Sequence, residues 1–426
     1  MINKPKGTYD VYGNYGKKLL ELENMFKNIM LLYNYEYIRT PIFESSNLFH
    51  RGVGETTDIV SKETYDFKDR GARDMTLRPE GTAGVVRAYI ENKIYADPNV
   101  PAKYWYYGPM YRYERPQSGR FREFYQFGVE AFGSNDPSLD AEVISIPVNI
   151  YKLLGLCGVK VKVNSLGDME SRNNYKEALL KHFKPHINEL CSDCKERYEK
   201  NPLRILDCKV DTNHESIQNA PIILDYLNEE SKKHFEDVKK YLNASNIEYE
   251  VDPNIVRGLD YYTHTVFEVE ANIGDDSKMN ILCGGGRYNK MVETVGGPDT
   301  SGVGFALGLE RLLGVLEKEN IEIPYEDEID CYIIPLTENE KEESIKLLTN
   351  LRMNAFKADT DYLNRNVKSN FKQADRLKAR FIILIGEEEV KSEIYTIKNN
   401  QTKEEFKINK ANIIDFLDEQ DEDHIH

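Results

Sequence analysis

The pattern of apolar and polar positions predicts a helix followed by several strands in the first hundred residues. Apolar residues recur at helical spacing over residues 17–33, and an extended segment around Pro41 follows. Strand-like patterns at residues 64–69 and 74–79 precede a helical pattern at residues 82–92. Helices and strands are therefore mixed from the start of the chain.

Two long strand-like segments come next, at residues 103–116 and 121–133. The polar loop RPQSGR joins them, and its Pro116 and Gly119 suit a turn, so we expect the two strands to run antiparallel. A helix at residues 140–154 and a strand at residues 159–167 follow. Residues from about 171 to 249 are predicted to be mainly helical.

The segment RGLDYYTHTVFEV is rich in β-branched and aromatic residues, which predicts a strand with Arg257 and Asp260 at its beginning. The segments NILCGGGRYNKMV and SGVGFALGLERLLGVLEKE then predict a strand and a glycine-hinged helix. Beyond the linker IPYEDEID, further strands and helices indicate a small α/β domain that finishes in a frayed acidic end, DEQDEDHIH.

These patterns divide the chain into two predicted domains. Residues 1–325 form an α+β domain built on an antiparallel sheet, with a mainly helical insertion at about residues 171–249. Residues 326–426 form the α/β domain with its short acidic tail. A length of 426 residues agrees with two or three domains, since domains usually hold about 100 to 200 residues.

Composition restricts the class of protein. With 40% hydrophobic and 30% charged residues the chain is typical of globular proteins. The start shows no leader-peptide pattern and no apolar run approaches the roughly 18 residues of a membrane span, so we expect a cytoplasmic protein without membrane contact. Six cysteines are too few for a disulfide scaffold and fit a reducing compartment.

The formal net charge of −16 argues against indiscriminate binding to nucleic acid. Two basic islands nevertheless interrupt the acidic chain. Residues 112–122 hold four arginines against Glu114, and residues 363–381 hold six lysines and arginines against Asp375. The islands predict either two separate contacts with a polyanion or two solvated faces.

Arginines also occur in segments that suit a ligand site. Arg112 and Glu114 are two residues apart on a predicted strand, so both face one side, where an arginine fork suits a phosphate. Arg311 follows a run of small residues that would let a ligand lie against the backbone. Arg257 is either a functional group or the partner of Asp260 in a structural ion pair. No P-loop motif occurs.

Several motifs together resemble one known family. YRYERPQSGRFREFYQ is similar to motif 2 of the class II aminoacyl-tRNA synthetases, GVGFALGLERL to motif 3, and the segment around Pro41 to the dimer-forming motif 1. RGLDYYTHTVFEV and LCGGGRYN resemble the two signatures of the histidyl-tRNA synthetase family. The resemblance runs from Lys6 to about Leu417, and it implies a class II catalytic domain followed by an anticodon-binding domain.

The resemblance implies ATP-dependent ligation of L-histidine to tRNA(His) through a histidyl-adenylate, with release of AMP and diphosphate. Catalysis would fall to Arg257 and Arg112, since a guanidinium stabilises the charge that gathers on the α-phosphoryl oxygens. Mg²⁺ would accompany ATP. The implied histidine-binding residues are Glu80, Gly81, Thr82, Arg112, Gln126, Glu130, Arg257, Tyr261, Tyr262 and Tyr288, and the implied ATP-binding residues are Arg112, Glu114, Arg120 and Arg311.

Two partners besides the small substrates are implied. The first partner is tRNA: the loop after residue 114 would contact its acceptor end, and the second basic island would contact its anticodon region. The second partner is another copy of the chain, because motif 1 implies a homodimer. The implied tRNA-binding residues are Arg115, Gln117, Arg120, Arg365, Lys368 and Lys372.

A metal site and two other functions are the alternatives. CSDC, at residues 191–194, with Cys208 and His214 further along, can be read as a zinc site. The same stretch resembles the family's insertion region, where reduced cysteines are expected, so no protein-held metal is predicted. His264 receives no role. The rival functions are a histidine-sensing regulatory subunit of ATP phosphoribosyltransferase and an RNA-binding module with an inactive synthetase core.

Overall fold

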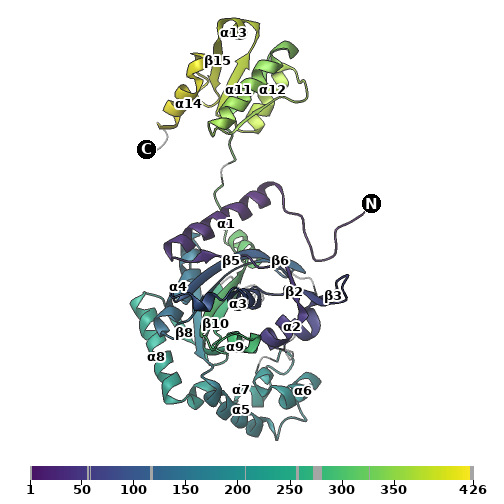
Figure 1. Ribbon diagram of the computed structural model, residues 1–426, viewed down its shortest axis with the longest axis vertical. Coiled ribbons are helices and arrows are strands. Elements are labelled where there is room, and N and C mark those ends of the chain that lie inside the picture. Colours follow the sequence, from purple (N-terminus) through teal and green to yellow (C-terminus); the bar gives the residue numbers. More distant parts are fainter. Residues whose placement is uncertain are drawn as a thin grey trace. The chain divides into compact units, whose positions relative to one another are not determined.

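The computed structural model describes residues 2–54, 57, 59–115, 119–206, 208–255, 259–271, 281–325 and 327–422. At residues 421 and 422 it describes the backbone alone. The chain forms two compact units, Met1–Pro324 and Tyr325–His426 (Figure 1). Among the described helices, none combines the length and apolar content that a membrane crossing needs.

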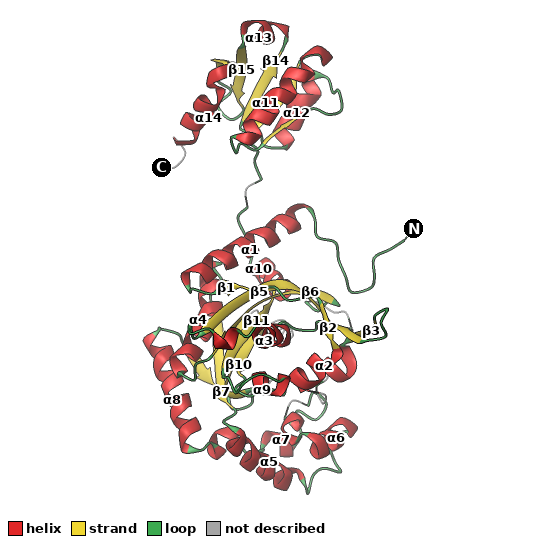
Figure 2. Cartoon of the chain, in the orientation of Figure 1, coloured by secondary structure: helices red, strands yellow, loops and turns green. Residues whose placement is uncertain are grey.

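An eight-stranded sheet forms the centre of the first unit, in the order β1-β5-β6-β11-β10-β9-β7-β8 (Figure 2). Its neighbours are antiparallel except for the pairs β1–β5 and β7–β8, which are parallel. The strands are β1 (Glu36–Tyr37), β5 (Ala102–Tyr111), β6 (Glu123–Phe132), β7 (Val159–Ser165), β8 (Tyr249–Val251), β9 (Thr263–Ala271), β10 (Ile281–Arg287) and β11 (Gly302–Gly308). The predicted antiparallel sheet is confirmed.

Each face of this sheet has its own apolar core, because successive side chains of a strand point to opposite faces. On β5, Trp105 belongs to one core and Tyr106 to the other. The first core receives side chains from α1 (Gly13–Leu32), α4 (Pro137–Leu153), α8 (Glu229–Ala244) and α10 (Leu309–Lys318). The second receives them from α2 (Ser46–Phe49), α3 (Thr82–Glu91) and α9 (Met291–Val295).

Two smaller parts complete the first unit. A three-stranded sheet joins β2 (Phe43–Ser45), β4 (Asp74–Leu77) and β3 (Tyr65–Lys68). The region predicted to be helical contains α5 (Met169–Phe183), α6 (Ser192–Lys200) and α7 (Glu215–Gln218) before α8. These helices share a separate core that includes Leu179, Phe183 and the buried Cys194.

The second unit is a five-stranded sheet in the order β13-β12-β14-β15-β16, with helices beside it. The strands are β12 (Cys331–Pro335), β13 (Ala358–Thr360), β14 (Phe381–Ile385), β15 (Ile394–Asn399) and β16 (Glu405–Asn409), and the helices are α11 (Lys341–Met353), α12 (Val367–Arg376), α13 (Glu387–Ser392) and α14 (Ile413–Glu422). The predicted frayed end is wrong over residues 418–422. They continue α14, whose Ile413 and Leu417 are fully buried.

Three local predictions are also wrong. The strand expected to begin at residue 257 begins at Thr263, so Tyr261 and Tyr262 precede it. The segment Gly302–Gly308 is strand β11 and not part of a hinged helix, because it pairs with β6 on one side and β10 on the other. β5 ends at Tyr111, so Arg112 and Glu114 lie in the loop beyond it.

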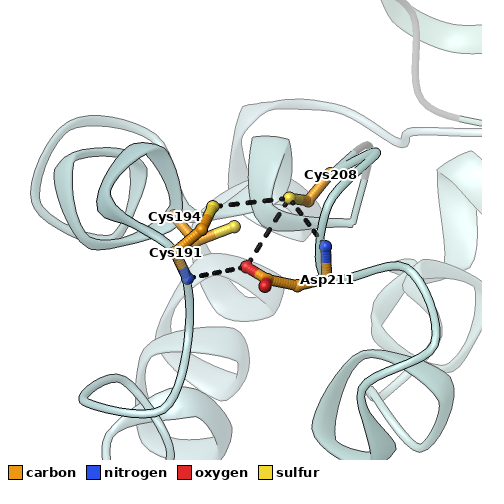
Figure 3. A group of neighbouring side chains, drawn as sticks. All are labelled: Cys191, Cys194, Cys208 and Asp211. Carbon is orange, nitrogen blue, oxygen red and sulfur yellow. Dashed lines mark hydrogen bonds between the residues drawn. The ribbon is translucent and has the colours of Figure 1, made fainter.

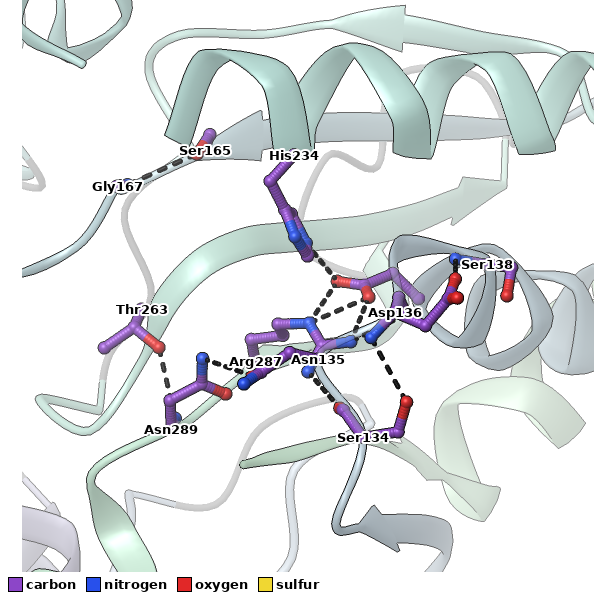
Figure 4. A network of polar contacts seen from close by, with 11 residues as sticks. Ser134, Asn135, Asp136, Ser138, Ser165, Gly167, His234, Thr263, Arg287 and Asn289 are labelled. Atoms are coloured by element: carbon purple, nitrogen blue, oxygen red, sulfur yellow. Dashed lines mark hydrogen bonds and ion pairs between the residues drawn. The ribbon is translucent and has the colours of Figure 1, made fainter. Parts of the chain in front are cut away.

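A buried ion pair ties the sheet to α4 (Figure 4). Arg287 at the end of β10 and Asp140 in the first turn of α4 have fully buried side chains. Arg287 Nε donates to both carboxylate oxygens at 2.9 and 2.8 Å, and its other nitrogens donate to the carbonyls of Ser134 and Asp136. Burial alone would raise the pKa of Asp140, but the charge of Arg287 and the hydrogen bond of His234 outweigh burial and lower it.

We expect Asp140→Asn to lower the free energy of unfolding by about 3 kcal/mol at pH 7, since it leaves the Arg287 charge buried without a counter-charge. A carboxyl group with a lowered pKa stabilises the fold above its unfolded pKa of about 3.9, and this contribution disappears as the pH falls through the lower folded value. The difference between the two proteins should therefore shrink below about pH 4.

Urea unfolding followed by tryptophan fluorescence measures this effect in the first unit, because Trp105 is the only tryptophan and is 5% exposed. Asp299→Asn is the control, since Asp299 forms an exposed pair with Lys290. An Asp140→Asn protein as stable as the control would contradict the prediction.

Candidate active site

A cavity of about 350 Å³ lies against the sheet of the first unit. Its walls come from the N-terminal end of α3, the loop between β5 and β6, the strands β9 to β11 and the start of α10. The predicted site residues that line it are Glu80, Thr82, Arg112, Glu114, Arg120, Gln126, Tyr261, Tyr262, Tyr288 and Arg311. Segments far apart in the sequence therefore meet at one place.

Other predicted residues lie elsewhere or cannot be placed. Gly81 and Glu130 are buried and are not among the lining residues, although Glu130 accepts hydrogen bonds from the lining residues Thr82 and Tyr288. Arg115 is exposed in the loop after β5. Arg257 and Gln117 fall outside the described residues, so their predicted roles remain predictions.

Glu130 is a buried carboxyl group surrounded by hydroxyl donors. It lies on β6 with no exposed surface, and Oε1 accepts from Thr82 Oγ1 at 2.6 Å and from the Tyr106 hydroxyl at 3.4 Å. The Tyr288 hydroxyl donates to Oε2. Burial raises the pKa of Glu130 to about 8, although the hydrogen bonds of Thr82 and Tyr288 act in the opposite direction. Near neutral pH this group can therefore exchange a proton.

Glycines give these side chains their space. A Cβ at Gly304 would lie 2.0 Å from Glu130 Oε2, and one at Gly302 would lie 2.2 Å from the Tyr288 ring. Both distances are far below van der Waals contact, so β11 must be glycine at these two positions. The motif GVGFALG thus makes room for a buried acid and its donor.

Glu80 and Gln126 are two polar residues of the cavity lining. The backbone N–H groups of Thr82 and Ala83 donate to the two oxygens of Glu80 at 2.8 and 2.7 Å, at the start of α3. Burial raises the pKa of Glu80 despite these two bonds. Gln126 is 9% exposed, and its Oε1 has no hydrogen-bond partner within the described part of the chain. Gln126 lines the cavity, and a buried acceptor without a described partner suits a ligand donor.

Arginines occupy another part of the wall. Arg112 donates from Nε to the Pro79 carbonyl at 2.8 Å, and Arg120 pairs with Glu114 at 3.0 Å. Arg311 on α10 donates to the Ile281 carbonyl at 3.1 Å, and burial lowers its pKa. The cavity therefore offers acids and an amide oxygen to a cation, and guanidinium groups to an anion.

Besides the apolar lining, three polar residues at or beside the cavity were not predicted: Tyr106, Glu268 and Glu310. Tyr106 contacts Glu130, and a Cβ at Gly81 would lie 2.3 Å from its ring. Glu268 of β9 and Glu310 of α10 line the cavity, and Glu310 accepts from the Tyr9 hydroxyl at 2.5 Å. Glu268 could have been noticed as an acid within the apolar run of its strand.

The segment that carries Tyr261 and Tyr262 is held by the helical insertion. Arg204 donates to Asp260 Oδ1 from Nη2 at 3.0 Å and from Nε at 3.2 Å. Arg172 Nη1 donates to the Tyr262 carbonyl at 2.9 Å. Asp260 therefore has a described arginine partner, Arg204, that the sequence did not indicate.

In the second unit the predicted basic residues differ in their surroundings. Arg365 Nη1 pairs with the buried Asp361 at 2.8 Å. Lys368 and Lys372 are exposed and lie one turn apart on α12. The two lysines therefore present their charges to solvent, whereas part of the Arg365 guanidinium is engaged.

Two family models together match most of the chain. A sequence profile described as histidyl-tRNA synthetase matches residues 7–312, and one described as an anticodon binding domain matches residues 330–420. The "Histidine--tRNA ligase" of Geobacillus sp. (strain WCH70) is 52% identical over 415 residues, 97% of this chain and 98% of the relative. That of Bacillus subtilis (strain 168) is 52% identical over 406 residues, 95% of this chain and 96% of the relative.

A solved structure agrees along the whole chain. The crystal structure of apo S. aureus histidyl-tRNA synthetase superposes with a TM-score of 0.85 at 46% sequence identity, and covers 98% of this chain and 100% of its own. Profile, sequence and structure thus agree with the motifs around the cavity. The chain belongs to the histidyl-tRNA synthetase family.

Proposed function

We propose that the protein joins L-histidine to tRNA(His) in two steps, through a histidyl-adenylate formed in the described cavity. The observation that carries the proposal is the buried Glu130, which accepts hydrogen bonds from the cavity-lining residues Thr82 and Tyr288. A neutral imidazole has one N–H donor and one acceptor nitrogen. Glu130 can accept from the donor and the Tyr262 hydroxyl can donate to the acceptor, so the site selects histidine over amino acids that lack this pair.

The ammonium group of histidine binds to Gln126, Glu80 and Thr82. Gln126 supplies the Oε1 that lacks a partner within the described residues, and Glu80 and Thr82 supply further oxygens. Gly81 keeps the backbone close to the Tyr106 ring, and Tyr261 and Tyr288 complete the apolar walls. The histidine carboxylate then points toward Arg112.

ATP binds among the arginines, with Arg112 on the α-phosphate and with Arg120, Glu114 and Arg311 around the rest of the nucleotide. Mg²⁺ accompanies ATP, and the cavity carboxylates Glu114 and Glu268 are oxygen ligands of the kind that this ion takes. When bound, the ion neutralises phosphate charge as diphosphate leaves. AMP is released after histidine passes to the tRNA.

Arg257 is proposed as the group that stabilises the transition state of activation. We expect Arg257→Ala to bind histidine with nearly unchanged affinity but to form the adenylate about 10²- to 10³-fold more slowly, the typical loss of one preorganised donor. Arg257→Lys should recover little, because an ammonium cannot replace the planar fork.

Histidine-dependent exchange of labelled diphosphate into ATP measures this step and tests the proposed function itself. Wild-type protein without exchange would refute the enzyme and favour the regulatory subunit or the inactive module. If Arg257→Ala showed normal exchange but a much lower unfolding midpoint, the role of Arg257 would be structural and not catalytic. The cavity arginines Arg112 and Arg311 and the anticodon-binding unit favour the enzyme over a histidine sensor.

The second unit is proposed to bind the anticodon region of tRNA, and Arg115, Gln117 and Arg120 its acceptor end. On α12 the exposed lysines contact phosphates, with Arg365 beside them. We expect Lys368→Glu with Lys372→Glu to weaken tRNA binding and to reduce the slope of log affinity against log salt by about 1.5, since each lost phosphate contact removes about 0.7 to 0.9. Lys346→Glu, an exposed position on α11, is the control.

Binding titrations at several salt concentrations measure the slope, and diphosphate exchange should not change in any of these variants. An equal loss of affinity in the control would mean that only net charge matters. If the variant with both Lys368→Glu and Lys372→Glu bound tRNA with unchanged affinity, this side of α12 would face solvent and not the tRNA.

The enzyme is proposed to be a homodimer. Large apolar side chains are exposed along the segment from the end of α1 through the edge strand β1 to β2: Leu32 is 85% exposed, Tyr37 52% and Phe43 54%. A second copy of the chain would cover them and the open edge of the sheet. We expect light scattering at micromolar concentration to give twice the chain mass of 49.4 kDa, and Leu32→Glu with Tyr37→Glu to lower it. A single-chain mass for the wild-type protein would refute the dimer.

A further inference from the structure

Four potential metal ligands gather in the helical insertion, away from the residues that line the cavity (Figure 3). This cysteine–aspartate cluster consists of Cys191, Cys194, Cys208 and Asp211. The sequence suggested His214 as a companion of the cysteines, but the structure places Asp211 there. His214 instead shares a 2.8 Å hydrogen bond with Ser216 at the start of α7. The chemistry of the group is therefore three sulfurs and one carboxylate.

Two distances in the cluster match the edges of a tetrahedral site, and the other ligand atoms lie near enough to complete it. One atom from each of the four residues lies within 4.8 Å of the others. The Sγ atoms of Cys191 and Cys208 are 3.7 Å apart, and Cys208 Sγ is 3.6 Å from Asp211 Oδ2. Zn–S bonds of about 2.3 Å and Zn–O bonds of about 2.1 Å give tetrahedral edges of about 3.8 Å for S···S and about 3.6 Å for S···O.

The local backbone orients the four groups. Cys191 is the N-cap of α6 and Cys194 lies in the first turn, so both sulfurs come from one helix start. The chain then returns, and Cys208 and Asp211 repeat the separation of three positions found between the first two cysteines. The Asp211 N–H donates to Cys208 Sγ at 3.3 Å, and the Cys191 N–H donates to Asp211 Oδ2 at 2.8 Å. Such bonds are typical of the surroundings of metal ligands.

We propose that the cysteine–aspartate cluster binds one Zn²⁺ ion in a closed tetrahedral site of three sulfurs and one oxygen. A closed set of four protein ligands belongs to structural zinc and leaves no position for substrate. The alternative of a disulfide between Cys191 and Cys208 would require the sulfurs to approach to about 2.0 Å. The insertion core is small, and small cores commonly depend on a metal for stability.

The site would also stabilise one wall of the cavity. Between Cys194 and Cys208 lie Asn201 and Arg204, and both side chains donate to Asp260 Oδ1. Asp260 directly precedes Tyr261, which lines the cavity. An ion that fixes both ends of residues 194–208 therefore restrains Tyr261 and Tyr262. Loss of the ion should lower the affinity for histidine more than the affinity for ATP. Only this consequence rests on the proposed function.

The test uses the full-length protein, purified without a metal-binding tag under reducing conditions. Elemental analysis measures zinc per chain, and competition with a chromophoric chelator measures affinity. Cys208→Ser and Asp211→Asn each remove one ligand. The matched controls are Cys157→Ser and Asp193→Asn. Cys157 is an exposed cysteine outside the cluster, and Asp193 is an acid on α6, the helix that carries Cys194. We expect one zinc per chain in the wild type and both controls, and at least a 10-fold loss of affinity in the ligand variants.

Replacement by Co²⁺ in the wild-type protein gives a readout that does not depend on how the variants fold. A thiolate-bound tetrahedral Co²⁺ has intense visible absorption, and zinc should abolish the signal stoichiometrically. Zinc at background level after loading, a Co²⁺ spectrum without thiolate bands, or equal losses in the controls would overturn the proposal. A Cys191–Cys208 disulfide found by mass spectrometry in the reduced, zinc-loaded protein would do so as well.

Discussion

The first unit depends on the ion pair between Arg287 and Asp140, two residues 147 positions apart that are both completely buried. A guanidinium without water must have a counter-charge and acceptors, and α4 with the loop before it provides both. Tyr288 follows Arg287 directly, so the same anchor places the hydroxyl that donates to Glu130. The Arg287–Asp140 pair therefore fixes both the packing of the sheet against α4 and the position of Tyr288 in the cavity wall.

The second requirement is space for buried polar groups between close-packed strands. Gly304 and Gly302 meet it by omitting side chains where Glu130 and Tyr288 lie. Antiparallel neighbours on both sides keep β11 regular despite its glycines. A strand of low intrinsic propensity thus persists because tertiary pairing outweighs local preference.

Much of this arrangement could be predicted from the sequence. Helical spacing over residues 17–33 and the strands around RPQSGR were recognisable from local pattern, and the family motifs selected ten of the residues that line the cavity. Local pattern could not show that β11 is a strand, because glycines in isolation signal turns and hinges. It also could not show the partnership of Asp260 with Arg204, which depends on contacts between distant segments.

The raised pKa of Glu130 has a consequence for the energetics of the empty protein. The folded chain holds this proton more tightly than the unfolded chain, so the stability it contributes is complete below the unfolded pKa and declines as the pH rises through about 8. Above about pH 8 the group is a buried anion whose described hydrogen-bond donors are all uncharged hydroxyls, whereas near neutral pH it is mostly protonated. A ligand that donates an N–H to the carboxylate would stabilise the ionised form, so binding of such a ligand should lower the pKa of Glu130.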